Sequence, residues 1–141
     1  MFDRTIALIG QDNLDKIESK HILIIGVGGV GGYAIETLIR SGIHNITLVD
    51  YDNIDISNIN RQIIAKESNV GKLKVEAWKE RINEINSSVL VNTLPLKIDE
   101  NNIDILFKSS YDYIIDACDT VIVKKLLIKK CHEKNIKLIT V

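Results

Sequence analysis

The sequence predicts an α/β domain of the Rossmann type, in which a doubly wound, mainly parallel sheet carries helices on both faces. Two observations support this prediction. Short apolar runs alternate with longer segments of helical periodicity, and the first run, HILIIG (21–26), is apolar throughout, as in strands covered on both faces. The glycine-rich stretch GVGGVG begins at the end of this run and leads into a helical pattern, as in nucleotide-binding units.

The same alternation predicts the later elements in order. Five strands are expected, at residues 21–26, 45–50, 88–94, 111–117 and 137–141. Five helices are expected, at residues 13–19, 30–41, 72–85, 99–108 and 121–134. Strands joined through helices imply right-handed crossovers and a parallel sheet. We expect a single domain over residues 1–141, with a helical segment over about 1–20.

Composition indicates a globular protein without an obvious polyanionic or membrane partner. The chain is 45% hydrophobic and 26% charged, with a formal net charge of −1. No apolar run reaches membrane length, and the first residues are charged, so we expect a cytoplasmic protein with no membrane contact. Cys118 and Cys131 have no zinc-like spacing and are compatible with a reducing compartment.

The last strand pattern, KLITV, ends at Val141 with no segment after it to complete a site. Natural termini tend to lie at a domain surface. We therefore expect this chain to be the N-terminal part of a longer domain, and activity of the 141 residues alone is in doubt.

The glycine loop suits the binding of a nucleotide's phosphates. Its glycines permit a tight turn and close approach of the backbone, and the N–H groups that open the next helix attract an anion. Asp50 ends the second strand, where an acidic residue often binds a ribose hydroxyl. These features alone fit an NAD-dependent oxidoreductase equally well.

The residues after Asp50 favour a triphosphate over the pyrophosphate bridge of a dinucleotide. The loop DYDNIDISNINRQ carries Asp52, Asn58 and Arg61, and Lys74 follows soon after. Arginine and lysine beside a phosphate loop can neutralise charge that develops when an α-phosphate is attacked and pyrophosphate leaves. Either cation alone would be interpreted as a solvated surface charge.

Five motifs in order then resemble one enzyme group: GVGGVG, LVDYD, SNINRQ, VGKLK and IDACD. Their pattern is similar to the ThiF, MoeB and HesA family of adenylating enzymes, which are related to ubiquitin activation. The resemblance covers residues 4–141. The segments FDRTIALIG and NINRQI look most like the tRNA threonylcarbamoyladenosine dehydratase branch.

The resemblance implies a nucleotide site at the matching positions: Gly26, Gly28, Gly29, Gly31, Asp50, Asp52, Asn58, Arg61 and Lys74. In this family the glycines lie under the phosphates, and the first acid of LVDYD holds the ribose with the second beside it. The side chains of Asn58, Arg61 and Lys74 would contact the phosphates.

The family also implies a metal site and an assembly. Asp119 would help to place Mg²⁺ and the triphosphate of ATP. Arg4 matches an N-terminal arginine that reaches the phosphates across a homodimer. Arg4, Arg61, Lys74 and Asp119 would thus carry the catalysis, mainly by positioning and charge neutralisation.

The reaction implied is activation of a carboxylate by ATP, on threonylcarbamoyladenosine of tRNA, leading to ring closure and dehydration. Three alternatives stay open: adenylation of the C-terminus of a ubiquitin-like sulfur-carrier protein, an NAD-dependent oxidoreductase, or a nucleotide-binding fragment without turnover. Trp78 is expected on the inner face of its helix. The lysines of residues 121–134 are expected to form a solvated face, and contact with tRNA phosphates is the lesser alternative.

Overall fold

The computed structural model describes residues 1–141 and confirms the predicted fold class. Its strands are β1 (His21–Ile25), β2 (Asn45–Val49), β3 (Leu90–Leu94), β4 (Tyr113–Asp116) and β5 (Lys137–Thr140). They form one sheet in the order β3-β2-β1-β4-β5, and every neighbouring pair is parallel. The winding direction therefore changes between β1 and β4, which opens a crevice at the carboxyl ends of these strands.

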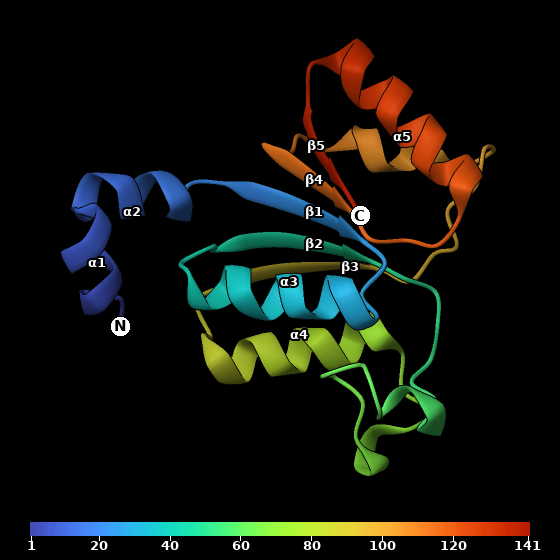
Figure 1. Cartoon of the computed structure of the whole chain (residues 1–141), viewed down its shortest axis with the longest axis horizontal. Helices are drawn as coiled ribbons and strands as arrows, with labels where there is room; N and C mark the ends of the chain where they lie inside the picture. The colour runs from blue at the N-terminus through green and yellow to red at the C-terminus, as the bar shows by residue number, and fades with distance from the viewer.

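Helices cover both faces of the sheet (Figure 1). The α-helices are α1 (Asp3–Ile9), α2 (Gln11–Glu18), α3 (Gly29–Arg40), α4 (Lys74–Ile85) and α5 (Val121–Lys134). Three short 3-10 helices are η1 (Ile56–Asn58), η2 (Glu67–Asn69) and η3 (Ile103–Lys108). Helices α3 and α4 lie on one face of the sheet, and α5 lies on the other. No helix has the length and apolar character needed to span a bilayer.

Each face of the sheet has its own hydrophobic core, because successive strand side chains point to opposite faces. Ile24 belongs to the core shared with α3 and α4, where Trp78 is fully buried. Leu23 belongs to the core shared with α5 and η3, together with Leu127. The two cores hold the strands and helices in place and so fix the geometry of the crevice.

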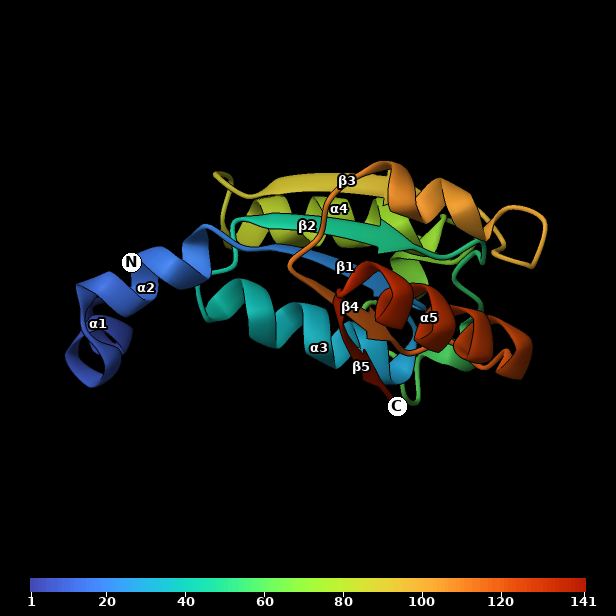
Figure 2. The ribbon, with the colours of Figure 1, turned by 90° about the horizontal axis from the view of Figure 1, so that it is seen from above.

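The N-terminal segment is helical, as expected, but it forms two helices instead of one. Gly10, with φ 80° and ψ 159°, separates α1 from α2. Figures 1 and 2 both show α1 and α2 projecting away from the sheet, beyond the amino ends of the strands. Helix α1 has no buried residue, and the Leu8 side chain is 86% exposed.

Several expected boundaries shift where local geometry interrupts a pattern. The expected helix 72–85 begins only at Lys74, because Leu73 has the extended backbone value ψ 131°. The expected helix 99–108 is reduced to η3, because the Asp99 carboxylate accepts from Asn101 N at 2.8 Å and holds a turn there. Strand β5 lies at one edge of the sheet of this chain and is mostly exposed.

Candidate functional site

A cavity of about 450 Å³ opens at the carboxyl ends of β1, β2 and β4. Its size lies within the range of small-molecule sites. The predicted site residues that line it are Gly26, Gly28, Gly29, Asp50, Asp52, Asn58, Arg61, Lys74 and Asp119. The fold thus brings together residues spread over almost a hundred positions of the chain, as the parallel topology requires.

The glycine loop between β1 and α3 is held rigidly on two sides. Gly26 N donates to Val49 O at 2.8 Å, and Val27 N donates to the Asp50 carboxylate at 2.9 Å. Gly26 has φ 84°, and a Cβ there would lie 2.6 Å from the Ala117 carbonyl oxygen, so only glycine fits. The loop therefore connects β1 directly to its two neighbouring strands.

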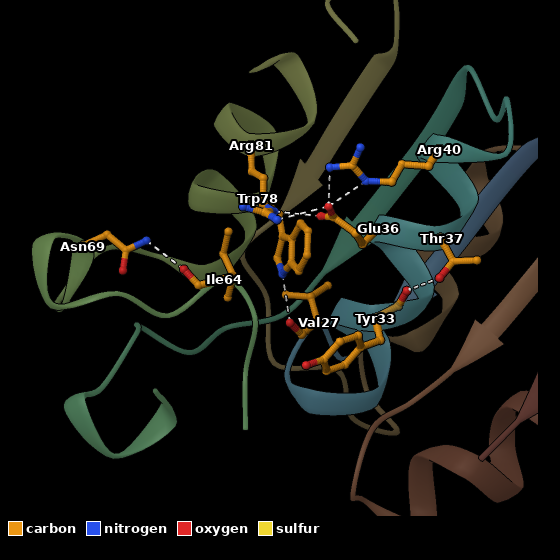
Figure 3. Close-up of polar contacts among 9 residues, drawn as sticks. All are labelled: Val27, Tyr33, Glu36, Thr37, Arg40, Ile64, Asn69, Trp78 and Arg81. Atoms are coloured by element: carbon orange, nitrogen blue, oxygen red, sulfur yellow. Dashed lines mark hydrogen bonds and ion pairs between the residues drawn. The ribbon is translucent and has the colours of Figure 1, made fainter. Parts of the chain in front are cut away.

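A tryptophan from α4 supports the same loop from the other side (Figure 3). Trp78 Nε1 donates to the Val27 carbonyl oxygen at 3.0 Å, in addition to packing in the core. Glu36 on α3 also joins α3 to α4. Its carboxylate accepts a hydrogen bond from Arg81 of α4 at 2.7 Å and another from Arg40 of α3 at 2.9 Å. Sequence reasoning placed Trp78 in the core but missed this hydrogen bond, because it joins residues 51 positions apart.

The loop leaves a set of backbone donors at the cavity. The N–H groups of Gly28, Gly29 and Val30, which line the cavity, make no hydrogen bond, and α3 has no side-chain cap at its N-terminus. Such groups carry the positive end of the helix dipole. This part of the cavity is therefore suited to a phosphate or another anion.

Asp50 and Asp52 share the wall formed by the end of β2. The Asp50 carboxylate accepts from Val27 N and from Asp52 N, each at 2.9 Å. Asp52 forms an ion pair with Lys74 at 2.9 Å, and the Lys74 side chain is only 6% exposed. Sequence reasoning placed both residues near the nucleotide but did not predict this pairing, which orients the ammonium group beside the cavity.

The loop around η1 supplies the other polar groups of the cavity. Asp55 N donates to Asn58 Oδ1 at 3.0 Å, so the buried Asn58 side chain is fixed with its amide N–H₂ group available. The exposed Arg61 guanidinium is held by the Ser57 carbonyl oxygen at 2.7 Å and by the Asn60 side chain at 2.9 Å. Both contacts leave other guanidinium N–H donors free.

Asp119 lines the cavity from the segment after β4, and its carboxylate makes no hydrogen bond or ion pair with the protein. The chain holds no cluster of three potential metal-ligating side chains. Mg²⁺ commonly binds through one or two carboxylates and completes its shell with waters and substrate phosphates. A free carboxylate facing a phosphate-sized cavity fits that mode of binding.

Asp116, missed by sequence reasoning, fixes the segment that carries Asp119. Its fully buried carboxylate accepts from Lys124 Nζ at 3.0 Å and from Thr140 Oγ1 at 2.9 Å. Burial alone would raise the pKa of Asp116, but hydrogen bonds from Cys118, Lys124 and Thr140 outweigh it and lower that pKa. Lys124 is thus a structural partner of Asp116, and the expectation that it belongs to a solvated face was wrong.

Cys118 lies between Asp116 and Asp119 in the sequence but is unsuited to nucleophilic chemistry. Burial, together with the neighbouring Asp116 carboxylate, raises the pKa of its thiol to about 11. The thiolate is the reactive form, and it is scarce at neutral pH when the pKa is this high.

Two predicted site residues lie outside the cavity. A Cβ on Gly31 would lie 1.8 Å from the Gly26 carbonyl oxygen, so Gly31 permits α3 to pack on β1 and is not part of the cavity wall. Arg4 lies near Arg40 and Ile85, at the C-terminal ends of α3 and α4. The length of α3, about 18 Å, separates it from the cavity of its own chain.

The fold, the glycine loop at the switch point and the polar cavity define an α/β nucleotide-binding domain. More specifically, the chain belongs to the ThiF family, whose family model matches residues 2–141. The predicted family is thereby confirmed.

The similar proteins include tRNA threonylcarbamoyladenosine dehydratases. The tRNA threonylcarbamoyladenosine dehydratase of Bacillus subtilis (strain 168) is 41% identical over 139 residues, which are 99% of this chain and 55% of that protein. The crystal structure of Escherichia coli tRNA N6-threonylcarbamoyladenosine dehydratase in complex with ATP has a TM-score of 0.95 at 40% identity, over 99% of this chain and 57% of that one. Its complex with AMP has a TM-score of 0.93 at 39% identity, over 97% and 56%.

The chain spans about half the length of the curated relatives it matches. It is homologous to enzymes of this family, and the E. coli relative binds ATP and AMP.

Proposed function

We propose that the protein containing this chain uses ATP to adenylate a carboxylate. One observation carries the proposal: Arg61 and Lys74 line the same cavity as the free N–H groups of the glycine loop. A nicotinamide dinucleotide offers no leaving group whose charge would need two cations. A triphosphate does, because pyrophosphate departs with its negative charge.

In the proposed reaction, an oxygen of the substrate carboxylate attacks the α-phosphorus of ATP. The bond to pyrophosphate breaks, and an acyl-adenylate forms. Gly28 and Gly29 would lie under the phosphates, and Asp50 would bind a ribose hydroxyl. Asn58, Arg61 and Lys74 would contact the phosphates, and their role is to position them and to neutralise charge.

Asp119 is the proposed protein ligand of Mg²⁺. When bound, the ion would neutralise the phosphates and polarise the phosphoryl group that is attacked. Asp119 suits this role because its carboxylate has no protein partner, whereas Asp116 and Asp52 are already paired with lysines.

We propose tRNA as the substrate, in agreement with the names of the most similar relatives. On a threonylcarbamoyl group, the acyl-adenylate would be attacked from within the same group, so that a ring closes and AMP leaves. The basic character of residues 121–141 supports an RNA partner: they hold six lysines and one glutamate in a chain of net charge −1.

We also propose a homodimer in which Arg4 serves the cavity of a second copy. Arg4 lies about the length of α3 from the cavity of its own chain. An arginine at that position contributes to the phosphates only if another subunit presents it.

Titration of the purified protein with ATP and Mg²⁺, and separately with NAD, tests the nucleotide assignment. We expect ATP to bind more tightly with Mg²⁺ than without it, because Asp119 and the phosphates share the ion. We expect NAD not to bind. Binding of NAD without ATP would contradict the adenylation proposal and favour an oxidoreductase.

Release of AMP and pyrophosphate, measured with candidate substrates, tests the substrate assignment. We expect tRNA carrying threonylcarbamoyladenosine to stimulate release, and mass spectrometry of the nucleosides to show the loss of water. Exchange of the exposed Lys125 and Lys129 for glutamate should weaken this stimulation while leaving ATP binding unchanged. Stimulation by a small protein ending in Gly-Gly instead of tRNA would favour a sulfur-carrier substrate.

A further inference from the structure

Gln62 is a cavity residue whose side chain has no role in the contacts described above. It follows Arg61, lines the cavity and is only 8% exposed. Its backbone is fixed on both sides, since Gln62 N donates to Asn58 O at 2.8 Å and Ala65 N donates to Gln62 O at 2.9 Å. The turns that follow η1 therefore fix the backbone of Gln62 beside the cavity.

The amide of Gln62 makes no hydrogen bond within the protein. Its oxygen Oε1 is inaccessible to solvent and has no hydrogen-bond partner. Its nitrogen Nε2 also has no partner, but it is accessible to solvent. Buried polar side chains are paired in the large majority of cases. The only other such oxygen is Asn45 Oδ1, at the amino end of β2, the opposite end of the strand from the cavity.

The amide lies directly against the glycine loop. A Cβ on Gly28 would lie 3.3 Å from Gln62 Nε2 and 3.6 Å from Cδ. Gly28 is the residue before α3, where the unpaired N–H groups face the cavity. The reachable atom of the amide, Nε2, is thus a further neutral donor at the proposed phosphate site.

We propose that Gln62 is a ligand-binding residue whose Nε2 donates a hydrogen bond to a phosphoryl oxygen held over Gly28. This inference rests on the proposed ATP-dependent function. A phosphoryl oxygen only accepts hydrogen bonds, so it matches the donor that the cavity presents. The unpaired Oε1 is then a cost to folding that is retained because the amide is needed for the ligand.

Calorimetric titration of Gln62→Leu and Gln62→Glu with ATP, AMP and adenosine tests the inference. The leucine variant should bind ATP about tenfold more weakly, which corresponds to one lost hydrogen bond. It should bind adenosine as the wild type does, because only phosphates contact the amide. Its melting temperature should not fall, since leucine removes an unpaired buried oxygen at similar volume.

The glutamate variant tests the direction of the hydrogen bond. A carboxylate beside phosphates should weaken ATP binding more than leucine does at pH 8, and this difference should narrow towards pH 5 as the carboxyl group becomes protonated. A purely structural role would produce no such pH dependence. Gln11→Glu, on the exposed face of α2, adds the same charge outside the cavity and serves as the control.

The outcomes separate this inference from the proposed function. If the wild type binds ATP and Gln62→Leu binds it equally well, Gln62 is not a phosphate ligand. If Gln62→Glu binds ATP as tightly as the wild type, the amide does not donate to a phosphate, and the inference is also wrong. If the wild type itself does not bind ATP, the proposed function fails.

Discussion

Replacement of Arg61 by alanine is expected to slow ATP-dependent adenylation by about 100- to 1000-fold, the usual cost of removing a donor that stabilises developing charge. Arg61 is exposed, and its guanidinium contacts only Ser57 and Asn60, so the fold should be retained. Pyrophosphate release under saturating ATP measures the rate, and a thermal melt checks the fold.

Two further variants sharpen the Arg61 experiment. Arg61→Lys keeps the charge but loses the planar set of donors, so its rate should lie between those of the wild type and the alanine variant. Lys79→Ala removes an exposed cation on α4, outside the cavity, and should leave the rate unchanged. A normal rate in Arg61→Ala would mean that the phosphates do not lie beside η1.

Replacement of Gly31 by alanine is expected to lower the free energy of unfolding of the domain by more than about 4 kcal/mol. Losses this large occur only with severe defects in the core. The added Cβ would lie 1.8 Å from the Gly26 carbonyl oxygen and 2.9 Å from its carbon, and neither backbone atom can move without displacing β1. The melting temperature should fall by more than about 10 °C, or the variant should not fold.

The same substitution two positions earlier should have the opposite effect on stability. A Cβ on Gly29 would meet nothing closer than the Arg61 carbonyl oxygen at 3.6 Å, and Gly29 is already helical. Gly29→Ala should stabilise the fold by about 0.4–1 kcal/mol through the unfolded state. It should nevertheless weaken ATP binding at least tenfold, because the methyl group would enter the cavity beneath the phosphates. Equal melting temperatures for the two variants would contradict this division of roles.

The comparison of Gly31 with Gly29 shows that the glycines of one motif serve two purposes. Gly26 and Gly31 permit close packing of β1, α3 and β4, and larger residues there would be excluded even in the absence of a ligand. Gly28 and Gly29 line the cavity, and a Cβ at either position would meet no backbone atom closer than 3.6 Å. Sequence reasoning assigned Gly31 to the phosphates together with the others, since a motif does not show which glycines line the cavity.

The sequence by itself determined the fold class and most of the cavity. Apolar runs separated by helical periodicity fixed five parallel strands, and the crossover rule then places their carboxyl ends at one edge. Because the glycine loop, Asp50 and Asp119 each follow a strand, that rule alone brings them together. Local patterns failed at boundaries such as Gly10, where a single backbone conformation ended a helix.

Only the tertiary structure decided which polar groups are already paired and which are free. Lys74 is paired with Asp52, and Lys124 with Asp116, whereas the carboxylate of Asp119 and the amide of Gln62 have no partner. The tertiary structure also placed Arg4 at the far end of α3. These properties depend on distances between segments far apart in the chain, such as the 51 positions between Val27 and Trp78, which periodicity and motif spacing do not specify.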